Sequence, residues 1–468
     1  MNRRLLLQGA LGVGLVAGVG ALGRYTVLAP PPSGRRANLD ELAAELVEAL
    51  LPAARAQALF PYDHPLRQYH NRGLWLGGLT VSAAALDWDT RRLLTDVMYA
   101  GLSDAGRGRV PFQDSTRFLG VNMMQLAVCG DPRVGPYQLL LSGVHLNLRL
   151  GSVSPEGAAF GGPQVYGDQR GNERVGLPNN IYRYQLEAAQ RLVAALTPAE
   201  RAHVRVARAP AQVNIGVQGA AGRFDGVPIA DLAPAKRVLV RELVAGILGT
   251  YADDAAAYAW QCLERNGGVD ALHFADYDED FDGGRRAGDG PSQVFRIEGP
   301  AAIFHFRGEP HLHAFVNVTM DGERPLGVGE VLGQNPAVLE GDALRALFET
   351  AMRAQAEADV AYYPSQAVVG RLRAGPVHVG DLWVAESWVN ELVVVEAQGA
   401  DLAPELAAVM RSRGTVPQAR SRYRIATIDY VARERTDLLG RVGPARKWGP
   451  LRDALVAHVR AQGFRRDA

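Results

Sequence analysis

The chain has 468 residues, long enough for two or three lobes that each bury a core. Basic and acidic residues are balanced at 50 each, and no basic run is interleaved with aromatic residues, which excludes nucleic acid and anionic surfaces as primary partners. The two cysteines, Cys129 and Cys262, are too few for a disulfide framework and lack metal-ligand spacing. They form either one bridge or two buried thiols.

The first residues have the pattern of an export signal. Arg3 and Arg4 precede an apolar, glycine-rich run from Ala10 to Leu22, and paired arginines are typical of the twin-arginine route, which exports folded proteins. We therefore expect residues 1–29 to be a signal peptide or, if uncleaved, a membrane tether. The run is short for a membrane-spanning helix. The predicted location is the periplasm or the outside of the cell, and the twin-arginine machinery is an expected partner.

Beyond the Pro-rich linker at 30–32, helical and strand patterns predict an α+β fold with a largely antiparallel sheet. Helices are predicted at 38–59, 90–102, 182–196, 234–251, 254–265 and 341–358, and strands at 144–150, 292–306 and 311–319. A break rich in turn residues at 333–340 predicts a main domain at 30–338 and a C-terminal α/β lobe at 339–468. No internal repeat is visible.

Three of the ten histidines, His305, His311 and His313, lie within nine residues. On a strand, His311 and His313 would project from one face, roughly 6–7 Å apart. Placing Phe306 on the same apolar side as Leu312 requires an odd number of residues in the connection, which brings His305 beside His311 or His313.

Histidine is the commonest metal ligand, so this spacing predicts a metal site. The alternative is a set of half-exposed strand histidines, each satisfied by a backbone carbonyl or by a carboxylate such as Glu309. A fourth candidate ligand is His145, which alternation places on a polar strand face with Asn147 and Arg149. Those polar residues could equally be plain solvent-facing positions.

An acidic segment, Asp278 to Gly283 with Asp289, matches a calcium-loop pattern. Arg285 and Arg286 sit inside it, and the pattern that follows is that of a strand rather than a helix, which favours a solvated acidic loop. Asp276, Asp278 or Asp280 could instead line a site beside the histidine-rich sheet. Calcium is therefore a secondary cofactor prediction.

Two motif groups resemble a bacterial family called "domain of unknown function 3500". They are residues 143–147 (Gly-Val-His-Leu-Asn) after Gly-Pro-Tyr at 135–137, and residues 295–300 followed by His-Leu-His at 311–313. The resemblance covers about residues 40 to 330 and implies an exported protein with no settled reaction. Val144 stands where the family commonly has the first histidine of a pair, so a site that uses that position is altered here.

The C-terminal lobe resembles the C-terminal domain of bacterial 5′-nucleotidases at 358–361, 371–382, 388–395, 399–402 and 423–427. In that family this domain supplies substrate contacts, and a separate domain holds two metals. The Asn-Gly-Gly-x-Arg signature is missing at 363–370, and no metallophosphoesterase motif occurs. The resemblance therefore implies the fold of this lobe but not the nucleotidase chemistry.

These observations predict an exported protein with a mononuclear metal site. The predicted ligands are His145, His305, His311 and His313, and Glu298 or Glu309 would orient a ligand or a bound water. Imidazole ligation without thiolate suits copper first and zinc second, and we favour a copper-dependent oxidoreductase with a small-molecule substrate. The alternatives are a metal-dependent hydrolase of phosphate or other esters, and a non-catalytic metal- or ligand-binding protein.

Overall fold

We describe the protein from a computed structural model. The structure describes residues 29–464, except 36, 69–76, 110–119, 123, 144–145, 152–181, 280–292, 309–311, 326 and 413. The predicted export signal lies almost entirely outside this part of the chain. Within the described ranges, no helix is both long enough and apolar enough to cross a membrane.

The main body consists of helices and strands, and the sequence patterns predict only some of them. Its helices are α3 (Leu39–Ala49), α4 (Pro52–Ala58), α5 (Trp88–Ala100), α6 (Asp104–Arg109), α8 (Arg183–Ala195), α9 (Pro198–Val204), α10 (Pro234–Leu248) and α11 (Asp253–Arg265). Its strands are β1 (Leu59–Phe60), β2 (Leu79–Thr80), β3 (Gln125–Gly130), β4 (Tyr137–Gly143), β5 (Leu146–Gly151), β6 (Arg205–Arg208), β7 (Val227–Pro228), β8 (His273–Glu279), β9 (Val294–Gly299), β10 (Ala302–Arg307) and β11 (His313–Val318).

One predicted helix and one predicted strand are each divided into two elements in the structure. The helix expected at 38–59 breaks between α3 and α4, because Leu51 precedes Pro52 and adopts the extended conformation that proline imposes on its neighbour. The strand expected at 292–306 is the antiparallel pair β9 and β10, which reverses at Pro300 and Ala301. The four predicted helices from residue 90 to residue 265 are confirmed with small shifts at their ends.

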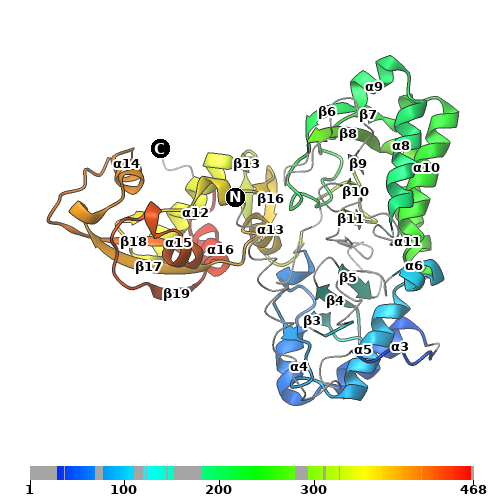
Figure 1. The fold of residues 1–468 in the computed structure, drawn as a ribbon, viewed down its shortest axis with the longest axis horizontal. Helices are drawn as coiled ribbons and strands as arrows, with labels where there is room; N and C mark the ends of the chain where they lie inside the picture. The colour runs from blue at the N-terminus through cyan, green and yellow to red at the C-terminus, as the bar shows by residue number, and fades with distance from the viewer. Residues whose placement is uncertain are drawn as a thin grey trace, which may run out of the picture.

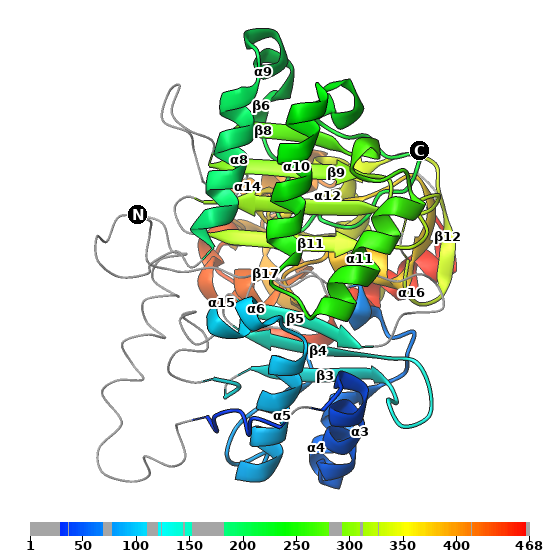
Figure 2. The ribbon, with the colours of Figure 1, turned by 90° about the vertical axis from the view of Figure 1, so that its right-hand side faces the viewer.

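The strands form two sheets, ordered β1-β3-β4-β5 and β11-β10-β9-β8-β6, with β2 and β7 pairing at their sides. Helices α3, α5, α8, α10 and α11 cover one side of the strands, and the C-terminal lobe lies on the other side (Figures 1 and 2). Both views also show β5 beside β11. Most strand pairs are antiparallel, which confirms the predicted α+β class.

Strand alternation separates the apolar side from the polar side of each sheet. The side toward the helices carries Phe304 and Phe306 of β10 and Ala314 and Val316 of β11, all buried in one core with α8, α10 and α11. Residues directly opposite each other on antiparallel strands project to the same side. The residues between these core positions therefore face the C-terminal lobe.

The C-terminal lobe has its own core around the four-stranded sheet β14-β18-β17-β19. β12 pairs with β16, so the chain has already entered this lobe when it reaches residue 331. Its elements are β12 (Val331–Asn335), β13 (Leu339–Glu340), α12 (Gly341–Ala356), β14 (Val360–Ala361), β15 (Arg371–Leu372), β16 (Gly375–His378), α13 (Val379–Ala385), β17 (Glu391–Gln398), α14 (Pro404–Ser412), β18 (Arg422–Ile428), α15 (Asp429–Glu434), β19 (Arg446–Pro450) and α16 (Leu451–Gln462).

Specific contacts join the two lobes. Gln68 of the main body donates from Nε2 to Oδ1 of Asp381 on α13 at 2.6 Å and accepts at Oε1 from the backbone N–H of Val328. Arg373 donates to the carbonyl of Val217 at 2.5 Å. These contacts hold the C-terminal lobe against the polar side of the main-body strands.

Both cysteines are buried free thiols, and they lie in different apolar clusters. Cys129 is on β3, and burial raises the pKa of its thiol to about 12. Cys262 is on α11, and burial raises the pKa of its thiol to about 11. Of the two sequence alternatives, the structure has the pair of buried thiols.

Candidate functional site

The β10–β11 hairpin places two of the predicted histidine ligands on one face. Five residues, 308–312, connect the strands, and Phe306 pairs with Ala314 on the helix side. The predicted odd-length connection is confirmed. His305 pairs with Phe315 and His313 pairs with Arg307, so both imidazoles project toward the C-terminal lobe.

Both imidazoles are buried. His305 is 1% exposed and His313 is 8% exposed, so the half-exposed alternative is wrong for these two residues. The ring of Phe315 lies beside both of them, with centroid distances of 5.9 Å to His305 and 6.2 Å to His313. The two histidines therefore line one buried surface, which we call the histidine face. It consists of the residues of β9, β10 and β11 that point away from the helices.

His313 is oriented from two sides. Its Nδ1 lies 2.8 Å from Oε1 of Gln212 and 2.9 Å from Nη2 of Arg307. The two contacts belong to different tautomers: Nδ1 donates to the amide oxygen when it carries the proton, and it accepts from the guanidinium when it does not. In the first tautomer, the ring lone pair lies on Nε2.

The chain segment 209–218 covers the histidine face. Gln212 comes from this segment, as does Ile215, which packs against Ile303 and Phe315. The carbonyl of Ile215 accepts a hydrogen bond from Nδ2 of Asn317 on β11 at 3.2 Å. This cover separates the face from solvent and explains why polar side chains there are buried.

Glu298, predicted as a catalytic residue, lies on β9 and is 5% exposed. Its Oε1 accepts a hydrogen bond from Nε2 of Gln218 at 2.6 Å, and its Oε2 lies 3.4 Å from Nη1 of Arg296. Nε of the same Arg296 lies 3.4 Å from Nδ1 of His305. Arg296 thus links the predicted carboxylate to a predicted metal ligand.

The structure describes three of the six predicted site residues. His145, His311 and Glu309 lie outside the described residues. In the part of the chain that the structure describes, no group of three or more His, Cys, Asp or Glu side chains comes together in a way that could hold a metal ion. The described site therefore contains two of the four predicted ligands and one of the two predicted carboxylates.

Two aspartates of the acidic segment, Asp276 and Asp278, lie in different surroundings. Asp278, near the end of β8, is bound by Nε of Arg205 at 2.8 Å, as a solvated surface pair would be. Asp276 pairs with Phe295 in the register and so points to the helix side, away from the histidine face. Its predicted role beside the histidines is wrong. Residues 280–289, which complete the calcium pattern, are outside the described ranges.

The polar side chains of β5 continue the buried surface beyond β11. Asn147 and Arg149 are 7% and 3% exposed, so they are not solvent-facing. Burial, and to a smaller extent the charge of Arg67, lowers the pKa of Arg149 to about 9. Arg67 stacks on Tyr62 and donates from Nε to Gln138. The side of the sheets toward the C-terminal lobe is thus rich in buried arginine as well as histidine.

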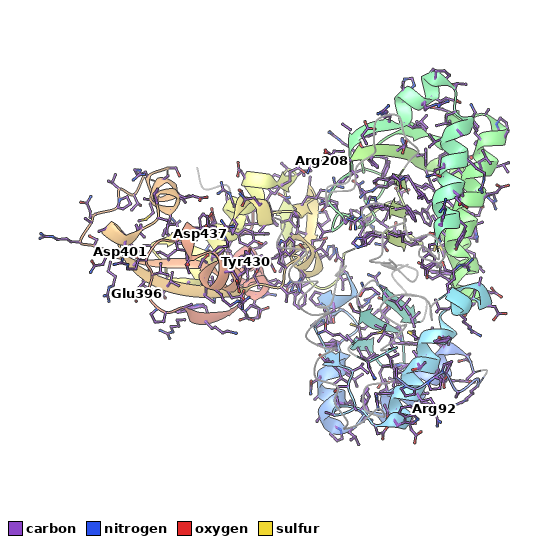
Figure 3. All side chains as sticks on the ribbon, in the orientation of Figure 1. Arg92, Arg208, Glu396, Asp401, Tyr430 and Asp437 are labelled. Atoms are coloured by element: carbon purple, nitrogen blue, oxygen red, sulfur yellow. The ribbon has the colours of Figure 1, made fainter. Side chains whose placement is uncertain are left out.

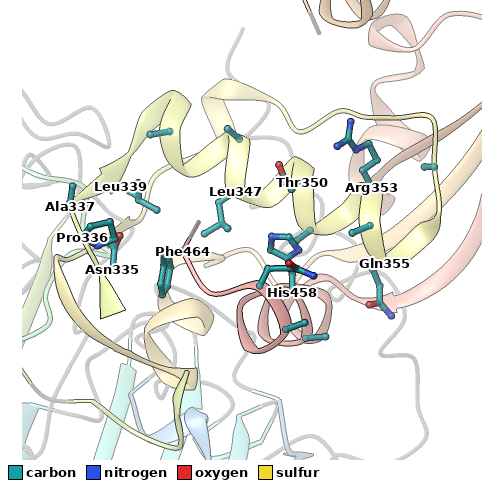
Figure 4. A pocket seen from close by; sticks show the side chains of 18 of the residues that line it. Asn335, Pro336, Ala337, Leu339, Leu347, Thr350, Arg353, Gln355, His458 and Phe464 are labelled. Atoms are coloured by element: carbon teal, nitrogen blue, oxygen red, sulfur yellow. The ribbon is translucent and has the colours of Figure 1, made fainter. Parts of the chain in front are cut away.

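Two hollows lie in the C-terminal lobe, away from the histidine face. One, of about 900 Å³, runs between α12 and α16 and is lined by Leu347, Thr350, His458 and Phe464 (Figure 4). The other, also of about 900 Å³, opens over the β17–β18–β19 sheet. Glu396 and Asp401, labelled in Figure 3, lie on its wall with four arginines: Arg422, Arg424, Arg441 and Arg446.

Sequence reasoning missed the most telling members of the site: Arg296, Arg307, Gln212 and Gln218. A signal for Arg296 was present, because Gly299-Pro300 marks a turn, and a hairpin there places Arg296 opposite His305. No local pattern marks Gln212, since its role depends on where segment 209–218 lies against the strands.

Solved structures with some similarity include a 5′-nucleotidase precursor from Thermus thermophilus, with 12% identity, a TM-score of 0.25, and coverage of 39% of this chain and 50% of that one. A second is a putative 5′-nucleotidase from Staphylococcus aureus in complex with alpha-ketoglutarate, with 9% identity, a TM-score of 0.23, and coverage of 40% and 52%. The first is described as a 5′-nucleotidase precursor and the second as a putative 5′-nucleotidase, the class of protein that the C-terminal lobe resembles in sequence. The chain spans about half the length of each of these structures.

No curated protein matches the chain. A family model does match, over residues 34–320, which is more than half of the sequence and contains the whole histidine face. The chain therefore belongs to the family described as "Protein of unknown function (DUF3500)".

Proposed function

We propose that the protein is an exported metal-binding protein whose ion is held at the histidine face, with His305 and His313 among its ligands. Copper is the favoured ion, zinc the second choice, and a copper-dependent oxidoreductase the favoured activity. The observation that carries the proposal is that two predicted ligands, from both arms of one hairpin, share a single buried face.

The surroundings of His313 fit such a role. A metal-bound histidine usually donates its other ring N–H to an acceptor, which fixes the tautomer and aims the ligating nitrogen. Oε1 of Gln212, 2.8 Å from Nδ1, is such an acceptor, and Nε2 of His313 is then the ligating atom. The further ligands in this proposal are His145 and His311, as the sequence predicts.

The ligand chemistry favours copper or zinc. Cys262 lies on the helix side of the sheets, and Cys129 lies on β3, in an apolar cluster separate from the histidines. The described residues of β9, β10 and β11 on this face therefore offer imidazole nitrogen without thiolate. Imidazole suits copper and zinc, and copper binds more tightly at equal geometry. A bound copper ion would supply one-electron chemistry. The chain would hold the imidazoles in place, and segment 209–218 would exclude bulk water.

Replacing Gln212 with alanine tests this proposal. We expect the affinity of metal-free protein for Cu²⁺ or Zn²⁺ to fall by about 10–100-fold, the usual effect of losing the acceptor behind a histidine ligand. A competition titration against a chromophoric chelator measures it. Gln57→Ala, at an exposed position on α4, is the control and should bind as the wild type does. Equal affinity of Gln212→Ala and wild type would argue against His313 as a ligand.

A metal-dependent hydrolase of phosphate or other esters is the second candidate. The observation in its favour is the guanidinium group of Arg307 beside His313, which would attract an anionic substrate to the ion. Turnover of a model phosphate ester that a chelator abolishes and Zn²⁺ restores would support this candidate over the oxidoreductase.

A further inference from the structure

Arg296 is one of the most deeply buried charged groups in the described chain. It lies in the middle of β9, is 1% exposed, and stands between Ala275 of β8 and His305 of β10 in the register. A guanidinium group has five N–H donors in a planar fork, and a buried one is costly unless these donors are satisfied. The contacts of Arg296 therefore show whether its N–H donors still lack an acceptor.

The contacts of Arg296 are long, and one nitrogen has none. Nε lies 3.4 Å from Nδ1 of His305, and Nη1 lies 3.4 Å from Oε2 of Glu298. Charge-assisted hydrogen bonds are normally about 2.7–2.9 Å long. Nη2 is buried and has no hydrogen-bond partner in the described structure. Buried polar atoms rarely stay without a partner, so Nη2 has donor capacity that a bound acceptor would satisfy.

Glu298 does not fill this role. Its Oε1 is taken by Gln218 at 2.6 Å, a closer contact than the one its other oxygen makes with Arg296. Across the histidine face, β9, β10 and β11 contribute two guanidinium groups, Arg296 and Arg307, and one carboxylate, Glu298. The described strands of this face therefore carry an excess of one positive charge, which favours an additional anion.

We propose that Arg296 binds an oxyanion, the carboxylate or phosphate group of a small-molecule ligand, through its Nη2 edge. The planar fork of arginine matches both groups, which accept two parallel N–H bonds. The inference rests on the proposed function in one respect: the anion is the substrate of the metal site. Binding of the anion by Arg296 does not itself require the metal.

The test uses Arg296→Lys, which keeps the positive charge and loses the fork. Binding of acetate and of inorganic phosphate to the full chain is measured at low ionic strength by calorimetry and by the rise in Tm. The wild type should bind at least one of the two, and the variant should bind it about tenfold more weakly or worse. The anion that binds identifies the chemical group. Arg205→Lys, at an exposed arginine with its own partner Asp278, should leave binding unchanged.

Equal binding by Arg296→Lys and wild type, or no binding of either anion to the wild type at tens of millimolar, would overturn the inference. The metal content of each preparation separates this result from the proposed function. A wild type that holds metal but binds anion independently of Arg296 refutes only the anion site. A wild type without metal whose anion binding depends on Arg296 refutes only the metal.

A second measurement does not depend on the variant folding. Crystals of the wild-type protein soaked in selenate, an oxyanion with an anomalous scatterer, should show a peak within hydrogen-bonding distance of Nη2 of Arg296. Peaks confined to other parts of the surface would contradict the assignment.

Discussion

Replacing His313 with alanine should lower the affinity for copper or zinc by at least about a hundredfold and leave the purified protein without stoichiometric metal. Losing an outer hydrogen-bond partner of a ligand already costs about 10–100-fold, and here the ligating nitrogen itself is removed. Because His313 is only 8% exposed, side chains at the protein surface are poorly placed to act as a ligand in its stead. Elemental analysis and a chelator competition measure the loss.

The matched control is His203→Ala. His203 is exposed on α9, so its removal should change neither the metal content nor the affinity. Circular dichroism of both variants shows whether the fold is kept. If His313→Ala retains the wild-type stoichiometry and affinity, the histidine face is not the metal site.

Replacing Arg452 with methionine should lower the free energy of unfolding by about 3–5 kcal/mol at neutral pH, the usual cost of leaving one member of a buried ion pair alone. Nε of Arg452 lies 3.6 Å from Oε2 of Glu386 and donates to the Glu386 carbonyl at 3.0 Å. Arg452 also stacks on Trp383, whose ring packs against the main body near Cys129. Urea unfolding followed by tryptophan fluorescence measures the change.

The stability that Arg452→Met loses should depend on pH. Burial raises the pKa of Glu386, and the charge of Arg452 partly opposes that rise. Without Arg452 the pKa rises further, so the folded state holds a proton that the unfolded state loses above its own pKa of about 4.3. The free energy of unfolding of the variant then falls as the pH rises from the unfolded-state pKa to the pKa of Glu386 in the folded state. We therefore expect Arg452→Met to lose less stability at pH of about 5 than at pH of about 8.

A double variant, Glu386→Gln with Arg452→Met, provides the control. Replacing both partners of a buried pair by uncharged side chains is often nearly neutral, so most of the lost stability should return, and the pH dependence should disappear. The amide oxygen that replaces the carboxylate would still accept the hydrogen bond from Asn390, which lies 2.6 Å from Oε1 of Glu386. A double variant as unstable as Arg452→Met alone would show that the charge of Glu386 is not the cause.

The parts of the fold that follow local patterns were predictable from the sequence. Apolar alternation placed Phe304 and Phe306 in the core and brought His305 and His313 to one face, which the register confirms. The helices at 182–196 and 234–251 were equally predictable, because their apolar positions recur at helical spacing.

What sequence reasoning missed depends on contacts between distant segments. Alternation showed that Asn147 and Arg149 share a face, but only the C-terminal lobe and neighbouring loops make that face a buried one. Gln212 reaches His313 across 101 positions of sequence. Arg296 was missed because a single strand over 292–306 hides the turn at Pro300 that brings β9 beside β10.

Elemental analysis of the as-isolated protein, together with its absorption spectrum, shows whether a metal ion is bound at the histidine face. We expect about one copper, or failing that one zinc, per chain, with weak visible bands when copper is present because the ligands are imidazoles. A folded protein that carries neither ion, and that takes up neither after incubation and desalting, would contradict this expectation.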